Sequence, residues 1–270
     1  MPELPEVETT VRALREPLVG QVITAVWNDW PNHIVTPELG ELRMRIQGQQ
    51  IEAINRRGKY LLFNLNEGDT LLIHLKMSGH LAVSPSDAPP DKYVHTIFFL
   101  ADGRELRFRD MRKFGRVYLV SDPQQIVGKL GPEPLEPTFT VALLTERLDG
   151  RRRVLKPLLL DQTFIAGVGN IYADEALFYA GLHPTRKSNS LSQAEIAALH
   201  QAIQKVLHLG IAREGASITL YTKPDGSKGD MQNAVAVFRR TGNPCYTCGT
   251  PIERIVLGGR STHYCPHCQN

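Results

Sequence analysis

The sequence predicts a multidomain α+β protein, in which a β-sandwich with one flanking helix is followed by a helical domain and a short cysteine-bearing β-hairpin. Short β-rich runs separated by turn residues fill 21–120, and apolar residues recur at helical spacing between 143 and 209. All four cysteines lie beyond residue 244. A chain of 270 residues is long enough for two or more domains.

The composition is typical of a soluble globular protein, with 42% hydrophobic residues and a mean hydropathy of −0.22. No apolar run approaches the ~18 residues of a membrane span, and the N-terminus lacks the apolar core of a signal peptide. We therefore expect a cytoplasmic protein that does not bind membranes. We also expect a monomer.

The basic residues are unevenly distributed. The net charge of +3 is too small to indicate a nucleic-acid partner by itself, but 104–116 holds six basic side chains against two acidic ones. Further basic residues gather at 151–156 and between 239 and 260. Such clusters could converge on one polyanion, although each cluster alone is also typical of an ordinary solvent-exposed surface.

The N-terminus carries a possible nucleophile. Removal of Met1 would leave Pro2 as a secondary amine. A chain-terminal amine has a pKa of ~8, so a fraction of it is uncharged at neutral pH. Attack on a sugar aldehyde would give an iminium ion, with Glu3 and Glu6 as candidate acid, base or electrostatic partners. An ordinary solvated chain end is the alternative.

A helix should follow directly, because Pro5 suits a first helical position and apolar residues recur with helical spacing up to Leu18. Pro17 and Gly20 should end it. Beyond it we expect strands, which would build the sandwich. Their ranges are 22–27, 46–54, 60–65, 70–75, 80–83, 96–100, 105–108 and 117–120.

A Gly- and Pro-rich stretch at 128–137 predicts a hinge, and the chain beyond it reads as helical. Ser192 and Glu195 form a possible capping box for the longest helix, which Gly210 should end. The polar segment 215–231 is either a functional mobile loop or a plain linker. The expected helices are 143–148, 155–161, 171–180 and 193–209.

Two Cys-x-x-Cys pairs near the C-terminus have the spacing of a four-thiolate zinc site. Four thiolates complete a tetrahedron, so the zinc should be structural, and neither His263 nor His267 should be a ligand. A redox dithiol or free thiols are the alternatives. The predicted ligands are Cys245, Cys248, Cys265 and Cys268.

Two further features could contact phosphate. The segment between the cysteine pairs reads as a hairpin with Arg260 at its tip, although such zinc hairpins also serve protein contacts or structure alone. Gly167-Val168-Gly169-Asn170 precedes a helix and could present backbone N–H groups to an anion, but packing glycines with an ordinary asparagine explain it equally well.

Seven stretches together resemble a known family in the same order along the chain. They are 2–8 (PELPEVE), 57–62 (RGKYLL), 74–79 (HLKMSG), 112–115 (RKFG), 131–135 (GPEPL), 167–173 (GVGNIYA) and the terminal cysteine hairpin. On these residues the chain is similar to the bacterial formamidopyrimidine-DNA glycosylases over nearly its whole length.

The resemblance implies a DNA repair enzyme with DNA bound in a cleft between two domains. The implied reaction is excision of oxidised purines such as 8-oxoguanine and formamidopyrimidines, followed by β,δ-elimination at the abasic site. The implied partner is double-stranded DNA, and the implied cofactor is one structural zinc ion. The implied regions are a catalytic sandwich at 1–130, a hinge at 131–149, a helix-two-turn-helix domain at 150–235 with a lesion-covering loop at 215–231, and a zinc finger at 236–270.

The resemblance also implies the catalytic residues. Pro2 matches the Schiff-base nucleophile, and Glu3 matches the acid/base partner that assists opening of the sugar ring. Glu6 matches a supporting carboxylate, Lys59 matches a lysine that contacts DNA near the lesion, and Arg260 matches an arginine of the site.

The remaining matches are DNA contacts. Met77, Arg112 and Phe114 match the residues that fill the void left by the flipped nucleotide, with Arg112 facing the orphaned cytosine. The positions that match phosphate contacts are Lys59, His74, Asn170 and Arg260. Lys113 is a further matching DNA-binding position, and Lys156 matches a basic position near the lesion pocket.

Two alternatives remain open from the sequence. One is the related branch of the endonuclease VIII type, which removes oxidised pyrimidines. The intact set of Met77, Arg112 and Phe114 favours the purine branch over it. The other is a non-catalytic zinc-finger DNA-binding relative, against which the retained Pro2, Glu3 and Lys59 argue. The segment 215–231 differs from the family's usual forms, which leaves the preference among lesions open.

Overall fold

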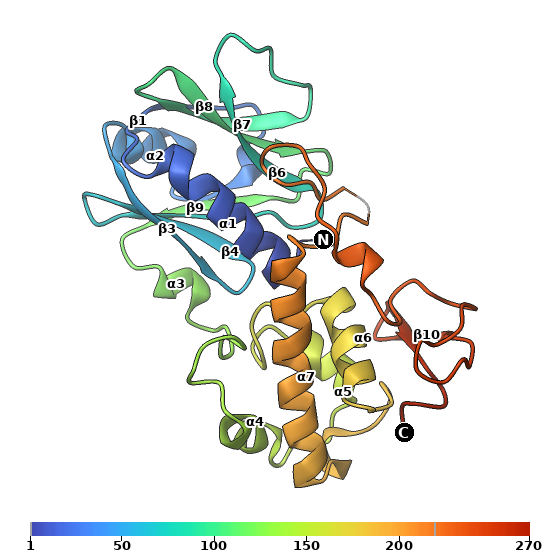
Figure 1. Cartoon of the computed structure of the whole chain (residues 1–270). Coiled ribbons are helices and arrows are strands. Elements are labelled where there is room, and N and C mark those ends of the chain that lie inside the picture. Colours follow the sequence, from blue (N-terminus) through green and yellow to red (C-terminus); the bar gives the residue numbers. More distant parts are fainter. Residues whose placement is uncertain (1, 219) are drawn as a thin grey trace. The chain divides into compact units, whose positions relative to one another are not determined.

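The computed structural model of the chain describes residues 2–218 and 220–270, which form two compact units (Figure 1). The first unit combines the N-terminal part of the chain up to Lys129 with Glu214–Asp230. The second combines Leu130–Arg213 with Met231–Asn270. The predicted linker 131–149 thus belongs to the second unit. The loop that we assigned to the helical domain is grouped with the first unit.

The first unit contains the predicted β-sandwich. A single hydrophobic cluster joins side chains from both sheets and from the N-terminal helix, which makes the space between the sheets the core of this unit. One sheet has the order β1 (Ile23–Asn28), β7 (Val94–Leu100), β8 (Arg104–Asp110) and β6 (Gly79–Pro85). The other has the order β2 (Ile34–Thr36), β9 (Arg116–Val120), β5 (Thr70–His74), β4 (Tyr60–Leu65) and β3 (Ile51–Arg57).

The pairing of the strands is antiparallel except between β2 and β9, which run parallel. Two tight connections leave side chains at the edge of the sandwich. Residues 75–78 connect β5 to β6, and residues 111–115 connect β8 to β9. These two turns carry Met77, Arg112 and Phe114.

The N-terminal helix α1 (Leu4–Leu18) forms as predicted and packs against β3, β4 and β6 (Figure 1). Val7, Val11 and Leu14 are fully buried on its inner face. Pro17 falls in the last turn of the helix and does not end it earlier. Two helices of this unit were not predicted, namely α2 (Leu39–Ile46) and α3 (Gln124–Val127).

The predicted strand 46–54 was wrong in its first half. Ile46 is the last residue of α2, where it is buried together with Leu42, and β3 begins only at Ile51. Gly48 lies between α2 and β3 at φ 85°. This left-handed conformation favours glycine and continues neither the helix nor the strand.

The second unit is helical, with a terminal hairpin. The helix α6 (Asn170–Tyr179) packs against α5 (Leu155–Leu160), α7 (Gln193–Ala212) and β11 (Arg260–Tyr264), so it lies at the centre of this unit (Figure 1). The Ser192–Glu195 capping box is present at the start of α7. The elements are α4 (Val141–Leu148), α5 (Leu155–Leu160), α6 (Asn170–Tyr179), α7 (Gln193–Ala212), β10 (Glu253–Leu257) and β11 (Arg260–Tyr264). Short 3-10 turns lie at Pro31–His33, Ser188–Ser190 and Met231–Asn233.

Gly210 does not end the longest helix, which corrects the prediction. The helix α7 runs on to Ala212, and a Cβ on Gly210 would come 2.5 Å from the Tyr172 ring. The glycine therefore permits close packing of α7 on α6 and is not a stop signal. Among the described residues, no helix has the length and apolar character that crossing a membrane requires.

Candidate functional site

The start of α1 is a buried, hydrogen-bonded structure and not a frayed chain end. Pro2 is buried, and the residues Glu3 and Glu6 are only 2% and 1% exposed. The Glu6 carboxylate accepts a hydrogen bond from the Glu3 N–H at 2.8 Å. This contact is one half of a capping box, which fixes the backbone directly after Pro2.

The same carboxylate also holds the loop 214–230. Its second oxygen, Oε1, accepts a hydrogen bond from the Ala216 N–H at 2.7 Å. Gly215 has φ +82°, and a Cβ there would lie 2.9 Å from the Glu6 Cγ. Glu6 thus connects the residue that follows Pro2 with the base of the loop.

Further contacts fix the body and tip of this loop on the first unit. The Tyr221 hydroxyl donates to the Glu6 backbone carbonyl at 3.3 Å, and burial, followed by the negative charge of Glu6, raises the pKa of Tyr221. At the tip, the His80 Nε2–H donates to the Lys223 carbonyl at 2.9 Å. Lys223 also pairs with Glu214 at 2.8 Å. The segment expected to be mobile therefore has defined contacts at its base, in its body and at its tip.

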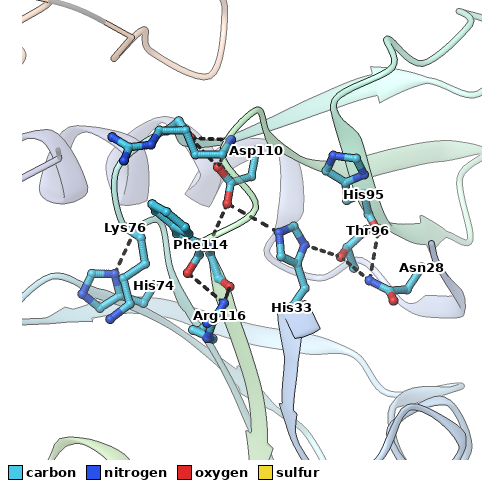
Figure 2. Close-up of polar contacts among 12 residues, drawn as sticks. Asn28, His33, His74, Lys76, His95, Thr96, Asp110, Phe114 and Arg116 are labelled. Carbon is cyan, nitrogen blue, oxygen red and sulfur yellow. Dashed lines mark hydrogen bonds and ion pairs between the residues drawn. The ribbon is translucent and has the colours of Figure 1, made fainter. Parts of the chain in front are cut away.

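Lys59 directly precedes β4 of the five-stranded sheet, and His74 ends the neighbouring strand β5. Gly58 and Lys59 form the turn between β3 and β4, with Gly58 at φ 57°, and Lys59 is only 5% exposed. His74 ends β5, and its ring stacks edge-on against Tyr60, with 4.6 Å between the ring centroids. Its Nδ1 accepts the Lys76 N–H at 2.9 Å (Figure 2).

His74 is an uncharged hydrogen-bonding group. Burial, followed by the positive charges of Lys76 and Lys59, lowers the pKa of His74 from 6.5 to about 3. Because Nδ1 accepts, the ring proton stands on Nε2. A phosphate contact by His74 would therefore be made by a neutral N–H donor and not by a cation.

The low pKa of His74 predicts acid sensitivity of the first unit. In the unfolded chain this ring takes up a proton near pH 6.5, whereas in the folded chain it resists protonation down to about pH 3, so stability falls as the pH drops below 6.5. Between pH 7.5 and 5, the wild-type protein should lose on the order of 1–2 kcal/mol more than His74→Gln. Both tryptophans, Trp27 and Trp30, lie in the first unit, so urea unfolding followed by their fluorescence measures this difference. Equal losses in the two proteins would contradict it.

The two turns at the end of the sandwich present the predicted void-filling side chains. Phe114 is 44% exposed, and the Arg112 guanidinium lies 4.8 Å from the centre of its ring. Met77 is half-buried in the neighbouring turn. Lys113 adopts φ 58° and places its Nζ 4.3 Å from the centre of the Trp30 ring. The Arg116 guanidinium donates to the Phe114 carbonyl at 3.0 Å (Figure 2), which holds the backbone of the aromatic residue.

The second unit carries Asn170 and Arg260 on separate elements. Asn170 is the first residue of α6, and its buried Oδ1 has no hydrogen-bond partner within the described chain, which is unusual for a buried polar atom. Arg260 is exposed at the start of β11, next to the turn of Gly258 and Gly259. Both glycines have positive φ, 54° and 72°, as a two-residue hairpin turn of this kind requires.

Lys156 lies inside the second unit, and this position does not support the expected DNA contact. Its side chain is fully buried, and Nζ lies 2.7 Å from Asp174 Oδ1. The ammonium also donates to the Ser261 carbonyl at 2.6 Å and to the Thr262 hydroxyl at 2.9 Å. Lys156 therefore connects α5 with α6 and with β11, the strand that begins with Arg260.

Sequence reasoning missed the two acidic residues of α6 that bind the C-terminal hairpin and the segment before it. Asp174 Oδ2 accepts the His263 N–H at 2.9 Å. Glu175, which is fully buried, accepts from three successive backbone N–H groups at 2.7–3.0 Å, those of Ala236, Val237 and Phe238. Two adjacent acids inside an otherwise apolar helix were the available signal, because such acids are buried only with partners.

The four cysteines fit one zinc ion. Their sulfur atoms all lie within 4.8 Å of one another. The Cys245–Cys268 and Cys248–Cys265 sulfur pairs are 3.9 Å and 3.5 Å apart, close to the ~3.8 Å that Zn–S bonds of about 2.3 Å impose on a tetrahedron. The cluster of apolar residues around them is small, so the metal supplies folding energy that this core lacks.

Comparisons with known proteins cover both units. The family model for the formamidopyrimidine-DNA glycosylase N-terminal domain matches residues 1–117, and the model for the H2TH domain of the same enzymes matches 130–222. A model described as the zinc finger found in FPG and IleRS matches 242–270. A formamidopyrimidine-DNA glycosylase of Symbiobacterium thermophilum is 46% identical over 100% of this chain and 89% of its own length.

Solved structures with the same fold include two DNA complexes. The first is a mutant FPG of Lactococcus lactis with Fapy-dG containing DNA, at a TM-score of 0.94 and 39% identity over 100% of both chains. The second is MutM with carbocyclic 8-oxo-G containing DNA, at a TM-score of 0.92 and 39% identity over 100% of both chains.

Proposed function

The chain belongs to the formamidopyrimidine-DNA glycosylase family, and from this membership we propose that it excises oxidised purines from double-stranded DNA and then cuts the strand at the abasic site. The observation that carries the proposal is the buried start of α1, where Glu6 fixes the backbone directly after Pro2. A terminal amine held in this way is positioned to react, whereas a frayed end is not.

Pro2 carries the covalent step of the proposed mechanism. Once Met1 is removed, the Pro2 nitrogen attacks C1′ of the damaged nucleoside, and the glycosidic bond breaks with its electron pair leaving on the base, which takes up a proton. Glu3 protonates the ring oxygen as the sugar opens, so that an iminium ion joins Pro2 to C1′. Glu6 and Lys59 support this chemistry as a positioning carboxylate and a DNA-contacting cation.

The iminium ion drives strand cleavage. Its positive charge acidifies the C2′ proton, and loss of that proton expels the 3′ phosphate. A second elimination expels the 5′ phosphate, and water then releases the sugar fragment from Pro2. A secondary amine forms only the cationic iminium adduct, so the iminium nitrogen can accept electrons in each elimination.

DNA is held by contacts from both units in this proposal. His74, Lys113, Asn170 and Arg260 bind the backbone, which positions the duplex without reading its sequence. The one zinc ion at the four cysteines holds the hairpin that bears Arg260. We assign catalysis to 1–130, the hinge to 131–149, DNA binding to 150–235 and the zinc finger to 236–270. The proposed lesion-covering loop at 215–231 lies within the third range, although most of it is grouped with the first unit. We propose a monomer that works on chromosomal DNA in the cytoplasm.

Borohydride trapping tests the proposal. The protein is incubated with an 8-oxoguanine:C duplex and reductant, and the cross-linked peptide is identified by mass spectrometry. We expect an adduct on Pro2. Tight binding without an adduct would contradict the enzyme assignment, and trapping on a thymine-glycol duplex alone would assign the chain to the oxidised-pyrimidine branch.

Arg112→Ala should weaken discrimination for cytosine opposite the lesion by roughly 10- to 100-fold, because one arginine contact to a base edge is worth ~1–3 kcal/mol. The measurement is the single-turnover excision rate of 8-oxoguanine opposite cytosine against that opposite adenine. Arg104→Ala is the matched control, since Arg104 belongs to the same basic segment but pairs with Asp102 away from the turn. An unchanged ratio in Arg112→Ala would remove Arg112 from this role.

Gly215→Ala should slow excision of the damaged base by about tenfold, while cleavage of DNA that is already abasic should change less, because the loop covers the flipped base. The added methyl would meet the Glu6 side chain at 2.9 Å. Gly226→Ala is the control, since Gly226 has the same φ of +82° but an added methyl there would have no neighbour within 4 Å. Equal effects of the two substitutions would show that backbone strain, and not the Glu6 contact, is responsible.

A further inference from the structure

The Asp110 carboxylate lies beneath both turns that carry the void-filling side chains. Asp110 is the last residue of β8, and its side chain is fully buried. Its Oδ1 accepts the Ser78 hydroxyl at 2.5 Å and the Arg112 N–H at 3.3 Å, and its Oδ2 accepts the Gly115 N–H at 2.6 Å. One carboxylate thus binds the turn of Met77 to the turn of Arg112 and Phe114.

Ser78 strengthens this connection. Its hydroxyl donates to Asp110 and accepts the Arg112 N–H at 3.0 Å, so the backbone of Arg112 is held from two sides. Gly115 is pressed into the same place, because a Cβ there would lie 2.3 Å from the Phe108 ring and 3.0 Å from Asp110 Oδ2. The Lys113 N–H donates to the Asp110 carbonyl at 3.1 Å, which closes the turn.

A buried row of side chains stands behind the carboxylate (Figure 2). His33 Nε2 lies 3.5 Å from Asp110 Oδ2, and its Nδ1 lies 3.1 Å from the Thr96 hydroxyl. The Asn28 amide donates to the Thr96 oxygen at 2.9 Å. The Thr96 proton can therefore point to Nδ1, which leaves the imidazole proton on Nε2, facing Asp110.

Asp110 is consequently an acceptor surrounded by donors. Burial alone would raise the pKa of Asp110, but the facing His33 imidazole and the hydrogen bonds from the Ser78 hydroxyl and the Gly115 N–H outweigh it and lower the pKa to about 2. The carboxylate stays ionised at every pH at which the protein works, and it needs no contact with DNA to hold both turns.

We propose that Asp110 is the positioning residue for recognition of the base opposite the lesion, because it joins the Met77 turn and the Arg112–Phe114 turn into one rigid wedge backed by His33. This inference rests on the proposed function. Arg112 reads a base edge only if its backbone is held to within about 0.5 Å, and Asp110 is the group that holds it.

Asp110→Asn changes this arrangement with almost no change in shape. The amide oxygen can still accept the Gly115 N–H and face His33 Nε2. The NH₂ group then faces the Arg112 N–H, so that two hydrogen-bond donors oppose each other. Ser78→Ala removes the contact between the turns and leaves the carboxylate in place. Each variant should lower the cytosine-to-adenine excision ratio about fivefold to tenfold, as expected for one lost hydrogen bond beside a buried charge.

The decisive test is a double-mutant cycle with Arg112→Ala, read out as that ratio. If Asp110 acts through Arg112, adding Asp110→Asn to Arg112→Ala should change the ratio less than about twofold. Glu105→Gln is the control, because Glu105 is a buried acid on the same strand that pairs with Arg107 away from both turns. It should lower the melting temperature without changing the ratio.

An unchanged ratio in both Asp110→Asn and Ser78→Ala, or fully additive losses in the double variant, would overturn the inference. A drop in the ratio of Glu105→Gln equal to that of Asp110→Asn would do the same, since it would make the effect one of general stability. Failure of the wild-type protein to excise 8-oxoguanine at all would instead refute the proposed function.

Discussion

A protein that keeps Met1 ahead of Pro2 should lose abasic-site cleavage by a factor on the order of 10³ or more and should give no borohydride-stable adduct. In such a protein the Pro2 nitrogen is part of a peptide bond, and an amide nitrogen has no free electron pair with which to attack C1′. The measurement compares processed and unprocessed protein on the same abasic duplex, after mass spectrometry has verified each N-terminus.

Pro2→Gly separates the amine from the proline ring. This variant keeps a terminal primary amine, so cleavage should be weakened but not abolished, whereas the unprocessed protein should be inactive. DNA affinity should be nearly equal in the two proteins, because Arg112, Asn170 and Arg260 are unchanged in both. Full cleavage by the unprocessed protein would contradict the assignment of the amine as nucleophile.

Removal of zinc should lower DNA affinity roughly 10- to 100-fold, because it releases the hairpin that positions Arg260, and a hydrogen bond to a charged group is worth ~1.5–3 kcal/mol. Fluorescence anisotropy on a duplex measures the affinity, and a colorimetric chelator measures zinc release. Trp27 and Trp30 fluorescence should stay native, because both residues lie in the sandwich.

Arg260→Ala is the matched control for zinc removal, because it deletes the contact and keeps the metal. It should weaken binding by a similar factor and reduce the dependence of log affinity on log salt by about one unit. Cys248→Ser should behave like the chelated protein. Unchanged affinity after proven zinc loss would refute the part that the hairpin plays in binding.

Local patterns were sufficient to predict several parts of the fold. The helix after Pro5 is defined by its own apolar spacing, and the zinc site by the spacing of its cysteines, so neither depends on distant residues. The sandwich was predictable for the same reason, since its strands are short β-rich runs between turn residues. These elements are the ones whose sequence signals lie within a few residues of one another.

The features that local patterns did not reveal are contacts that join distant parts of the chain. Gly210 carries the usual signal of a helix end, but its role is set by Tyr172 on another helix. Lys156 is buried beside Asp174, a pairing that its charge alone does not indicate, and its contact with DNA stays a prediction. Asp110 gave no signal at all, because its partners Ser78 and His33 are brought to it by the pairing of strands.

The Glu6 carboxylate has a thermodynamic consequence, since its two oxygens serve the Glu3 and Ala216 amides at once. Ordering the base of the loop therefore also orders the backbone beside Pro2, because both depend on the position of Glu6. By linkage, ordering that backbone stabilises the loop by the same free energy. Under the proposed mechanism, a bound nucleotide that orders the loop would therefore also order the backbone beside the Pro2 amine, and an adduct on the amine would order the loop. Substrate enclosure and nucleophile alignment would then be parts of a single equilibrium.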